Sequence, residues 1–209
     1  MNLVKVKICG ITNVSDALNA AACGADAVGF VFYEKSSRFC SIEKAKEISN
    51  RLPPFISKVG LFVNAKHDFI EAILNENIID VIQFHGSESN TFCKAFNCPF
   101  IKVISVKNDT NITKISEDFV DASAILLDTF DAANYGGTGK SFDWKQIPAK
   151  INKPLIIAGG LNDCNVKELL EDVKPYAVDV SGGVEDAEKG FKSKKLMSSF
   201  IKVVKNAEL

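Results

Sequence analysis

The stretch Leu155-Ile-Ile-Ala-Gly-Gly-Leu-Asn-Asp-Cys-Asn-Val166 contains one complete structural unit. Its first four residues are apolar and include two isoleucines, so they predict a short buried strand over Leu155–Ala158. A glycine pair then allows a tight turn, and Asn162 is of a residue type that often starts helices. Strand, turn and helix in this order make a β/α unit, and repeats of such units build parallel sheets.

The same unit recurs along the whole chain of 209 residues. Amphipathic runs open at helix-capping residues such as Asn13 and Ser41, and Gly24 is expected to end the first helix. The predicted strands are Val4–Ile8, Ala27–Phe32, Lys58–Val63, Val81–Phe84, Phe100–Ser105, Ala124–Leu127, Leu155–Ala158 and Ala177–Val180. Eight units of about 26 residues use up the length, so we predict one α/β domain over residues 1–209, closed as a (β/α)8 TIM barrel. An open, doubly wound sheet is the alternative.

Composition narrows the range of functions. The chain carries 25 basic and 26 acidic side chains, a formal net charge of −1, and 46% of its residues are hydrophobic. Because no basic excess is present to neutralise phosphates, we expect no nucleic acid partner. No apolar run approaches the roughly 18 residues of a membrane span, and the N-terminus lacks the apolar stretch of a signal peptide. We therefore expect a cytoplasmic protein with no membrane partner.

Six cysteines and two histidines are scattered through the chain. No Cys-x-x-Cys pair occurs, and neither His67 nor His85 stands at zinc-finger spacing from a cysteine. We therefore expect no metal site and no cofactor, and we interpret most of the thiols as fillers of the core or surface. The sequence leaves open whether the protein is a monomer or a homodimer.

In a barrel of this kind the active site lies where the strands end and the following loops begin. The residues at those ends are polar, nucleophilic or rich in glycine. In chain order they include Cys9, His85, Asp128, Gly159-Gly160 and Ser181-Gly182-Gly183. The last two loops predict a phosphate site, because glycines let backbone amides approach an anion and a helix start adds positive charge. Tight turns that need a positive φ would also explain the glycines.

Two of these residues have side chains suited to proton transfer. Asp128 closes an apolar strand, where a carboxylate either caps the loop or acts as a general acid. Cys9 is either a small core residue or a base or nucleophile, although at an ordinary pKa only a few per cent of a thiol is ionised at pH 7. Lys7 shares the face of Cys9, and Asp179 shares the inward parity on the last strand. We predict that Lys7 pairs with Asp179 and favours the Cys9 thiolate.

Two further stretches lie in predicted loops. Arg38 follows the second strand. Its guanidinium group is either solvated or holds a substrate carboxylate through its planar, two-pronged set of N–H donors. Gly139-Lys140-Ser141 imitates the end of a nucleotide-binding P-loop, but Asn134 occupies the position of the first glycine. We therefore interpret residues 135–144 as a flexible loop after the sixth strand.

Taken together, these stretches resemble the phosphoribosylanthranilate isomerase family of tryptophan biosynthesis over essentially the whole chain. The most specific matches are Lys7-Ile-Cys-Gly-Ile-Thr12 and the run from Gly136 to Trp144. The resemblance implies an Amadori rearrangement of N-(5-phosphoribosyl)anthranilate to 1-(2-carboxyphenylamino)-1-deoxyribulose 5-phosphate by general acid–base catalysis, the third stage of tryptophan synthesis from chorismate. The implied partner is this small phosphosugar-anthranilate substrate.

The resemblance also implies a role for most of the candidate residues. Asp128 would be the acid that protonates the ring oxygen, and Cys9 the base that removes the C2′ proton. Arg38 would hold the anthranilate carboxylate and Asp179 would lie near the ribose, while His85 matches the family motif without a clear role. Phosphate would bind at Gly159, Gly160, Ser181, Gly182 and Gly183, although the family usually has serine where this chain has Gly182.

Two other functions compete with this interpretation. A histidine-pathway sugar isomerase performs the same rearrangement in a similar barrel, but it uses an aspartate where this chain has Cys9. A catalytically silent barrel that serves as a binding module would have no need of Cys9 and Asp128. Turnover of phosphoribosylanthranilate separates these alternatives.

Overall fold

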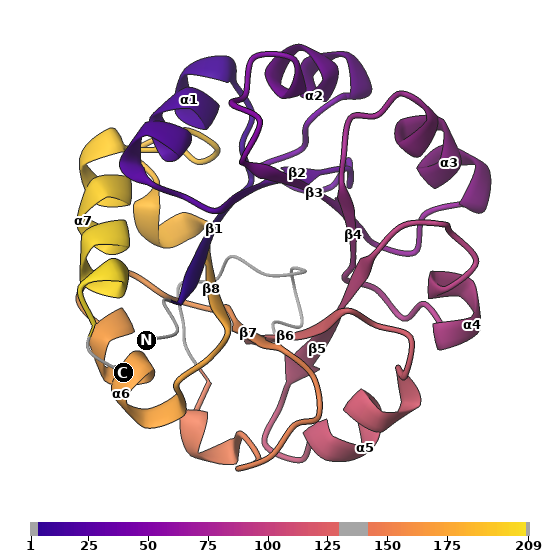
Figure 1. Cartoon of the computed structure of the whole chain (residues 1–209), viewed down its shortest axis with the longest axis vertical. Helices are drawn as coiled ribbons and strands as arrows, with labels where there is room; N and C mark the ends of the chain where they lie inside the picture. Colours follow the sequence, from indigo (N-terminus) through magenta and orange to yellow (C-terminus); the bar gives the residue numbers. More distant parts are fainter. Residues whose placement is uncertain (1–3, 130–141, 208–209) are drawn as a thin grey trace.

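Eight parallel strands form a closed ring with the helices on its outside (Figure 1). The computed structural model describes residues 4–129 and 142–207. The strands are β1 (Lys5–Cys9), β2 (Ala27–Val31), β3 (Ser57–Phe62), β4 (Val81–Phe84), β5 (Phe100–Val106), β6 (Ala124–Thr129), β7 (Leu155–Ile157) and β8 (Ala177–Val180). Each strand pairs with the next, and β8 pairs with β1. The predicted barrel is confirmed, and the alternative prediction of an open, doubly wound sheet is wrong.

The described segments form helices between the strands. They are α1 (Val14–Cys23), α2 (Ile42–Ser49), α3 (His67–Asn75), α4 (Asn90–Cys93), α5 (Ile112–Asp118), α6 (Val166–Val173) and α7 (Lys194–Lys205), with 3₁₀ turns η1 (Trp144–Gln146) and η2 (Gly182–Val184). Asn13 and Ser41 cap α1 and α2 with their side chains, and Gly24 ends α1 with a φ of 96°. These predicted caps are confirmed.

The predicted start of α6 at Asn162 is wrong. The Asn162 side chain accepts hydrogen bonds from the backbone amides of Cys164 and Asn165, which closes a local turn. The helix begins only at Val166, with Asn165 at its cap position. An asparagine side chain that binds the backbone two residues ahead stabilises a turn and competes with the helix.

The barrel interior consists of an apolar layer below a polar one. Alternate residues of a strand face inward, so Val59, Leu126 and Ile156 fill the lower interior. Two residues further along the same inward faces come polar groups, among them Asp128 after Leu126 and Asp179 after Ala177. The polar layer therefore lies at the carboxyl ends of the strands, on a floor of packed aliphatic side chains.

Within the described segments, no helix is both long enough and apolar enough to cross a membrane.

Candidate active site

A pocket opens at the carboxyl ends of the strands, and all of the candidate residues line it. They come from β1, β6 and β8 and from the loops after β2, β4, β7 and β8: Cys9, Arg38, His85, Asp128, Gly159, Gly160, Asp179, Ser181, Gly182 and Gly183. Residues far apart in the sequence are thus brought to one cavity by the closed ring of strands. This convergence is a property of the fold, and it leaves the role of each residue to be argued from its contacts.

Lys7 and Asp179 form a buried ion pair across the seam between β1 and β8. The two residues are register partners, and the Lys7 Nζ donates to Asp179 Oδ1 over 2.9 Å. Both side chains are almost fully buried, so the predicted pairing is confirmed. Gly29 stands opposite Cys9 on β2, and a Cβ there would lie 2.9 Å from Cys9 Sγ and 3.1 Å from Lys7 Cε. The missing side chain of Gly29 is what makes room for Cys9 beside the ammonium.

The ionisation of Cys9 differs from the prediction. Burial raises the pKa of the Cys9 thiol, and the Lys7 ammonium lowers it by a smaller amount. The predicted direction of the lysine effect is correct, but desolvation of the thiolate outweighs it. Burial also raises the pKa of Asp179 against the opposing effect of Lys7. Burial therefore favours the neutral thiol of Cys9, and nearby positive charge favours the thiolate.

Asp128 ends the inward face of β6 with its carboxylate toward β4. Its Oδ1 accepts a hydrogen bond of 2.8 Å from the Thr129 amide, and its Oδ2 lies 3.4 Å from His85 Nε2. Both side chains are at most 9% exposed. The imidazole therefore faces the carboxylate directly, where it can share or relay a proton with it.

Gln83 is a pocket residue that the sequence interpretation did not single out. It lies on β4, two residues before His85 on the same inward face, and is only 1% exposed. Its Oε1 accepts no hydrogen bond in the described part of the chain. The available signal was a lone polar residue within the otherwise apolar run Val81-Ile-Gln-Phe84.

Arg38 is held flat by a carboxylate that the sequence did not associate with it. Its Nε and Nη2 donate to the two oxygens of Glu185 over 2.6 and 2.8 Å. The buried Lys192 donates to the same carboxylate over 3.0 Å and to Ser181 Oγ over 3.2 Å. Although burial alone would raise it, these two cations lower the pKa of Glu185 to about 2. Two cations share one anion here, which leaves a net positive charge beside Cys9.

The two glycine loops pack against each other. Gly159 and Gly160 have φ values of 84° and 66°, and a Cβ on Gly183 would lie 1.9 Å from the carbonyl oxygen of Leu161. The structure therefore confirms that these glycines meet a backbone requirement. That explanation is compatible with anion binding, because the loops also line the pocket.

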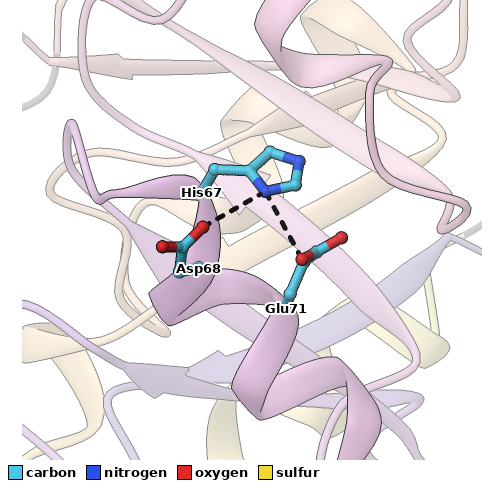
Figure 2. Close-up of side chains that lie close together, drawn as sticks. All are labelled: His67, Asp68 and Glu71. Carbon is cyan, nitrogen blue, oxygen red and sulfur yellow. Dashed lines mark ion pairs between the residues drawn. The ribbon is translucent and has the colours of Figure 1, made fainter.

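Among the residues that the structure describes, one group of metal-ligating side chain types lies outside the pocket, at the start of α3 (Figure 2). His67 Nδ1 lies 3.9 Å from Asp68 Oδ1 and 3.5 Å from Glu71 Oε2. Both carboxylates are exposed, and the imidazole stacks on Phe96 with the ring centroids 4.6 Å apart. We interpret this group as a surface cluster, since Asp68 lies in the first turn of α3, where an acidic side chain stabilises a helix. Gly139-Lys140-Ser141 lies outside the described residues, so its assignment to a loop stays a prediction.

Comparison with known proteins gives consistent results. A family model described as N-(5'phosphoribosyl)anthranilate (PRA) isomerase matches residues 6–203. The chain is 46% identical over 207 residues to the N-(5'-phosphoribosyl)anthranilate isomerase of Pseudomonas putida (strain GB-1), covering 99% of this chain and 100% of that protein. Its fold is similar to that of phosphoribosyl anthranilate isomerase from Thermotoga maritima, with a TM-score of 0.89, 41% identity and coverage of 97% and 99% of the two chains.

Two further structures add information. One describes monomers generated from the dimeric Thermotoga maritima enzyme; it has a TM-score of 0.85 and 38% identity, and the match covers 98% of this chain and 100% of that one. The other is a phosphoribosyl anthranilate isomerase in complex with reduced 1-(o-carboxyphenylamino)-1-deoxyribulose 5-phosphate. It has a TM-score of 0.80 and 39% identity, with 97% and 99% of the two chains covered.

Proposed function

The chain belongs to the N-(5'-phosphoribosyl)anthranilate isomerase family, and we propose that Cys9 and Asp128 are the base and the acid of its reaction. The protein is an isomerase of tryptophan biosynthesis that acts on phosphoribosylanthranilate. The histidine-pathway isomerase and the silent binding module are thereby excluded as its function. The single observation that carries the proposal is that both side chains line one pocket from different strands, β1 and β6.

The first step opens the ribose ring. Asp128 in its acid form gives its proton to the ring oxygen, the bond from this oxygen to C1′ breaks, and the anthranilate nitrogen lone pair forms a C1′=N double bond. The product is a cationic Schiff base with a free hydroxyl group. Because His85 Nε2 lies 3.4 Å from Asp128, the imidazole is placed to restore the proton to the carboxylate between turnovers.

The second step moves the hydrogen from C2′. The Cys9 thiolate takes the C2′ proton, and the electron pair left behind neutralises the Schiff base to give an enolamine. Protonation at C1′ and loss of the hydroxyl proton at C2′ then give the ketone. The Schiff base cation adds positive charge near Cys9, which favours the thiolate against the effect of burial on the pKa of this thiol. Ring opening thus precedes formation of the effective base.

The two ends of the substrate have separate anchoring groups in this proposal. Arg38 binds the anthranilate carboxylate while Glu185 fixes its guanidinium plane. The glycine loops at Gly159-Gly160 and Gly182-Gly183 bind the phosphate through backbone amides. Asp179 lies between these ends beside Lys7, where it can contact the ribose hydroxyls.

Arg38→Met is expected to weaken binding of the reduced product analogue about 10- to 100-fold, because a charge-assisted hydrogen bond pair contributes roughly 1.5–3 kcal/mol. Titration calorimetry with reduced 1-(o-carboxyphenylamino)-1-deoxyribulose 5-phosphate measures the effect. Arg51 is exposed and lies outside the pocket, so Arg51→Met is the matched control and should bind normally. Unchanged affinity in Arg38→Met would contradict the assignment of the carboxylate site.

We further propose that residues 1–209 act as a single catalytic barrel domain in the cytoplasm. A thiol base must remain reduced, and the six cysteines of the chain are all free. Reducing compartments keep such thiols in that state.

The face opposite the pocket suggests a second copy of the chain as a partner. Loops that lead from a helix into the next strand lie on this face, and three of them carry large exposed apolar side chains. These are Phe55, which is 94% exposed, Val120 and Tyr176. Exposed apolar groups on one face mark contact sites, and the related Thermotoga maritima enzyme is described as dimeric. We propose a homodimer through this face.

Phe55→Ser is expected to shift the sedimentation equilibrium of the protein from dimer to monomer while leaving kcat unchanged. The reason is that a fully exposed phenylalanine contributes about 2 kcal/mol only when a partner buries it. Leu18→Ser removes an exposed apolar residue from α1 instead and serves as the control. A wild-type protein that sediments as a monomer at every concentration would refute the proposed dimer.

A further inference from the structure

Another buried ion pair lies outside the barrel wall, behind the pocket. Lys102 of β5 donates to Glu88 Oε2 over 2.8 Å, and the two side chains are 5% and 3% exposed. Its neighbours Ile101 and Val103 fill the barrel interior, so Lys102 points outward, with its ammonium 5.2 Å from the ring centre of Phe119. Removing two charges from water is costly, and a buried ion pair is often no more stabilising than an apolar one. Its presence therefore calls for a role other than stability.

The pair binds the backbone of two loops that border the pocket. Glu88 accepts hydrogen bonds from the amides of Asn64, over 2.8 Å, and of Gly86, over 3.0 and 3.2 Å. Lys102 donates to the carbonyl of Gly86 over 2.7 Å. The N–H and the C=O of Gly86 are thus both held by the charged pair. These bonds tie the loop after β3 to the loop after β4.

Steric contacts also restrict the Gly86 peptide. A Cβ on Gly86 would lie 2.5 Å from Asn64 Oδ1 and 2.7 Å from Glu88 Oε1, so the two side chains close directly onto the peptide. Asn64 has a φ of 50°, in the left-handed region, and its Oδ1 accepts a hydrogen bond of 2.9 Å from the Ser87 amide. A strained residue that persists in a loop is held there by its surroundings. Here the buried carboxylate of Glu88 is among the groups that hold it.

His85 immediately precedes this fixed peptide. Its own amide donates to the carbonyl of Phe62 on β3 over 2.8 Å, so the backbone is held on both sides of the imidazole. We propose that Glu88 and Lys102 are positioning residues for the reaction, which fix the Gly86 peptide and thereby hold the His85 imidazole against Asp128. The inference rests on the proposed function, in which Asp128 is the acid.

The direct test is the spectrum of the imidazoles, because the chain has only two histidines. In Glu88→Gln, the ¹H–¹⁵N imidazole signals of His85 are expected to shift and broaden, while those of His67 stay in place as an internal reference. Glu76→Gln makes the same chemical change in the exposed ion pair with Lys46 and should move neither set. Unchanged His85 signals in a folded Glu88→Gln variant would overturn the proposal.

Kinetics provide the second readout. Glu88→Gln is expected to lower kcat about 10- to 100-fold, since misplacement of a catalytic group by about 1 Å has effects of that size. KM should change little, because Glu88 contacts neither Arg38 nor the glycine loops. In a His85→Asn background the same substitution should have no further effect on kcat, because the group that it positions is gone. Equal losses in both backgrounds would show a general structural role and overturn the proposal.

The experiment separates this inference from the proposed function. If His85→Asn and Asp128→Asn retained full activity, the assignment of the acid would fail, whereas the imidazole spectra would still report whether Glu88 positions His85. Lys102→Met leaves the Glu88 carboxylate buried without its cation and is expected to unfold more readily than the wild type. Glu88→Gln keeps the shape of the side chain and therefore carries the test.

Discussion

Cys9→Ser is expected to lower kcat by about 10²- to 10⁴-fold, the range for loss of a general base. A serine hydroxyl is a far weaker acid than a thiol, so no effective base forms when the substrate becomes a Schiff base. Loss of the fluorescence of freshly made phosphoribosylanthranilate follows the reaction. Wild-type kcat/KM should rise with pH as the thiolate forms, because burial raises the pKa of Cys9 in the free protein, and this rise should be absent from the variant. Rates equal to those of the wild type would refute the assignment of the base.

Cys40→Ser is the matched control for this change. Cys40 is also a buried thiol, and burial raises its pKa to about 12. It lies outside the pocket, so the same exchange of sulfur for oxygen should lower the free energy of unfolding without affecting kcat. A comparable loss of kcat in Cys40→Ser would mean that the effect at Cys9 comes from packing.

Asp128→Asn is expected to lower kcat by a similar factor, about 10² to 10⁴, through an earlier step. The amide keeps the shape of the carboxyl group and can still accept the hydrogen bond from the Thr129 amide, but it has no acidic proton for the ring oxygen. The ribose ring should therefore remain closed. Borohydride reduction distinguishes the two variants, because hydride adds to an open-chain Schiff base. A reduced ribityl adduct should accumulate above the enzyme-free blank with Cys9→Ser but not with Asp128→Asn.

Asp26→Asn provides the control at the other end of the barrel. Asp26 precedes β2 and accepts hydrogen bonds from the Val6 amide and from the lysines at positions 5 and 205. Loss of its charge should destabilise the fold, as thermal unfolding will show, and should leave kcat unchanged. Trapping of an adduct in Asp128→Asn at the level of Cys9→Ser would contradict the order of steps.

Strand positions were predictable because each β/α unit carries its own signal. The eight predicted strands agree with the observed ones to within two residues at each end. The start of α6 was not predictable to the same degree, because Asn162 and Asn165 are both suitable caps and the side chain of Asn162 closes a turn before the helix. The local sequence thus defines the helices and strands, whereas the residue at which a helix begins depends on competition between alternative caps and turns.

Parity and strand order were enough to predict one of the site's ion pairs. Lys7 and Asp179 could be paired because barrel closure makes the first and last strands neighbours. No such rule joins Arg38 to Glu185, since both lie in loops whose paths the sequence does not define. The Glu88–Lys102 pair did leave a signal, a lone lysine in the otherwise apolar run Phe100-Ile-Lys-Val-Ile104, but its partner depends on the loop after β4.

The ion pair between Lys7 and Asp179 spans the seam where the beginning of the chain meets its end. Cys9 lies at this same seam, so the environment of its thiol is complete only after β8 has docked against β1. During synthesis Lys7 emerges early, and its carboxylate partner Asp179 emerges 172 residues later. Until then the thiol is open to alkylating reagents, and afterwards it is 6% exposed. The rate at which Cys9 becomes resistant to alkylation therefore measures the rate of barrel closure. A refolding experiment can follow it without any substrate.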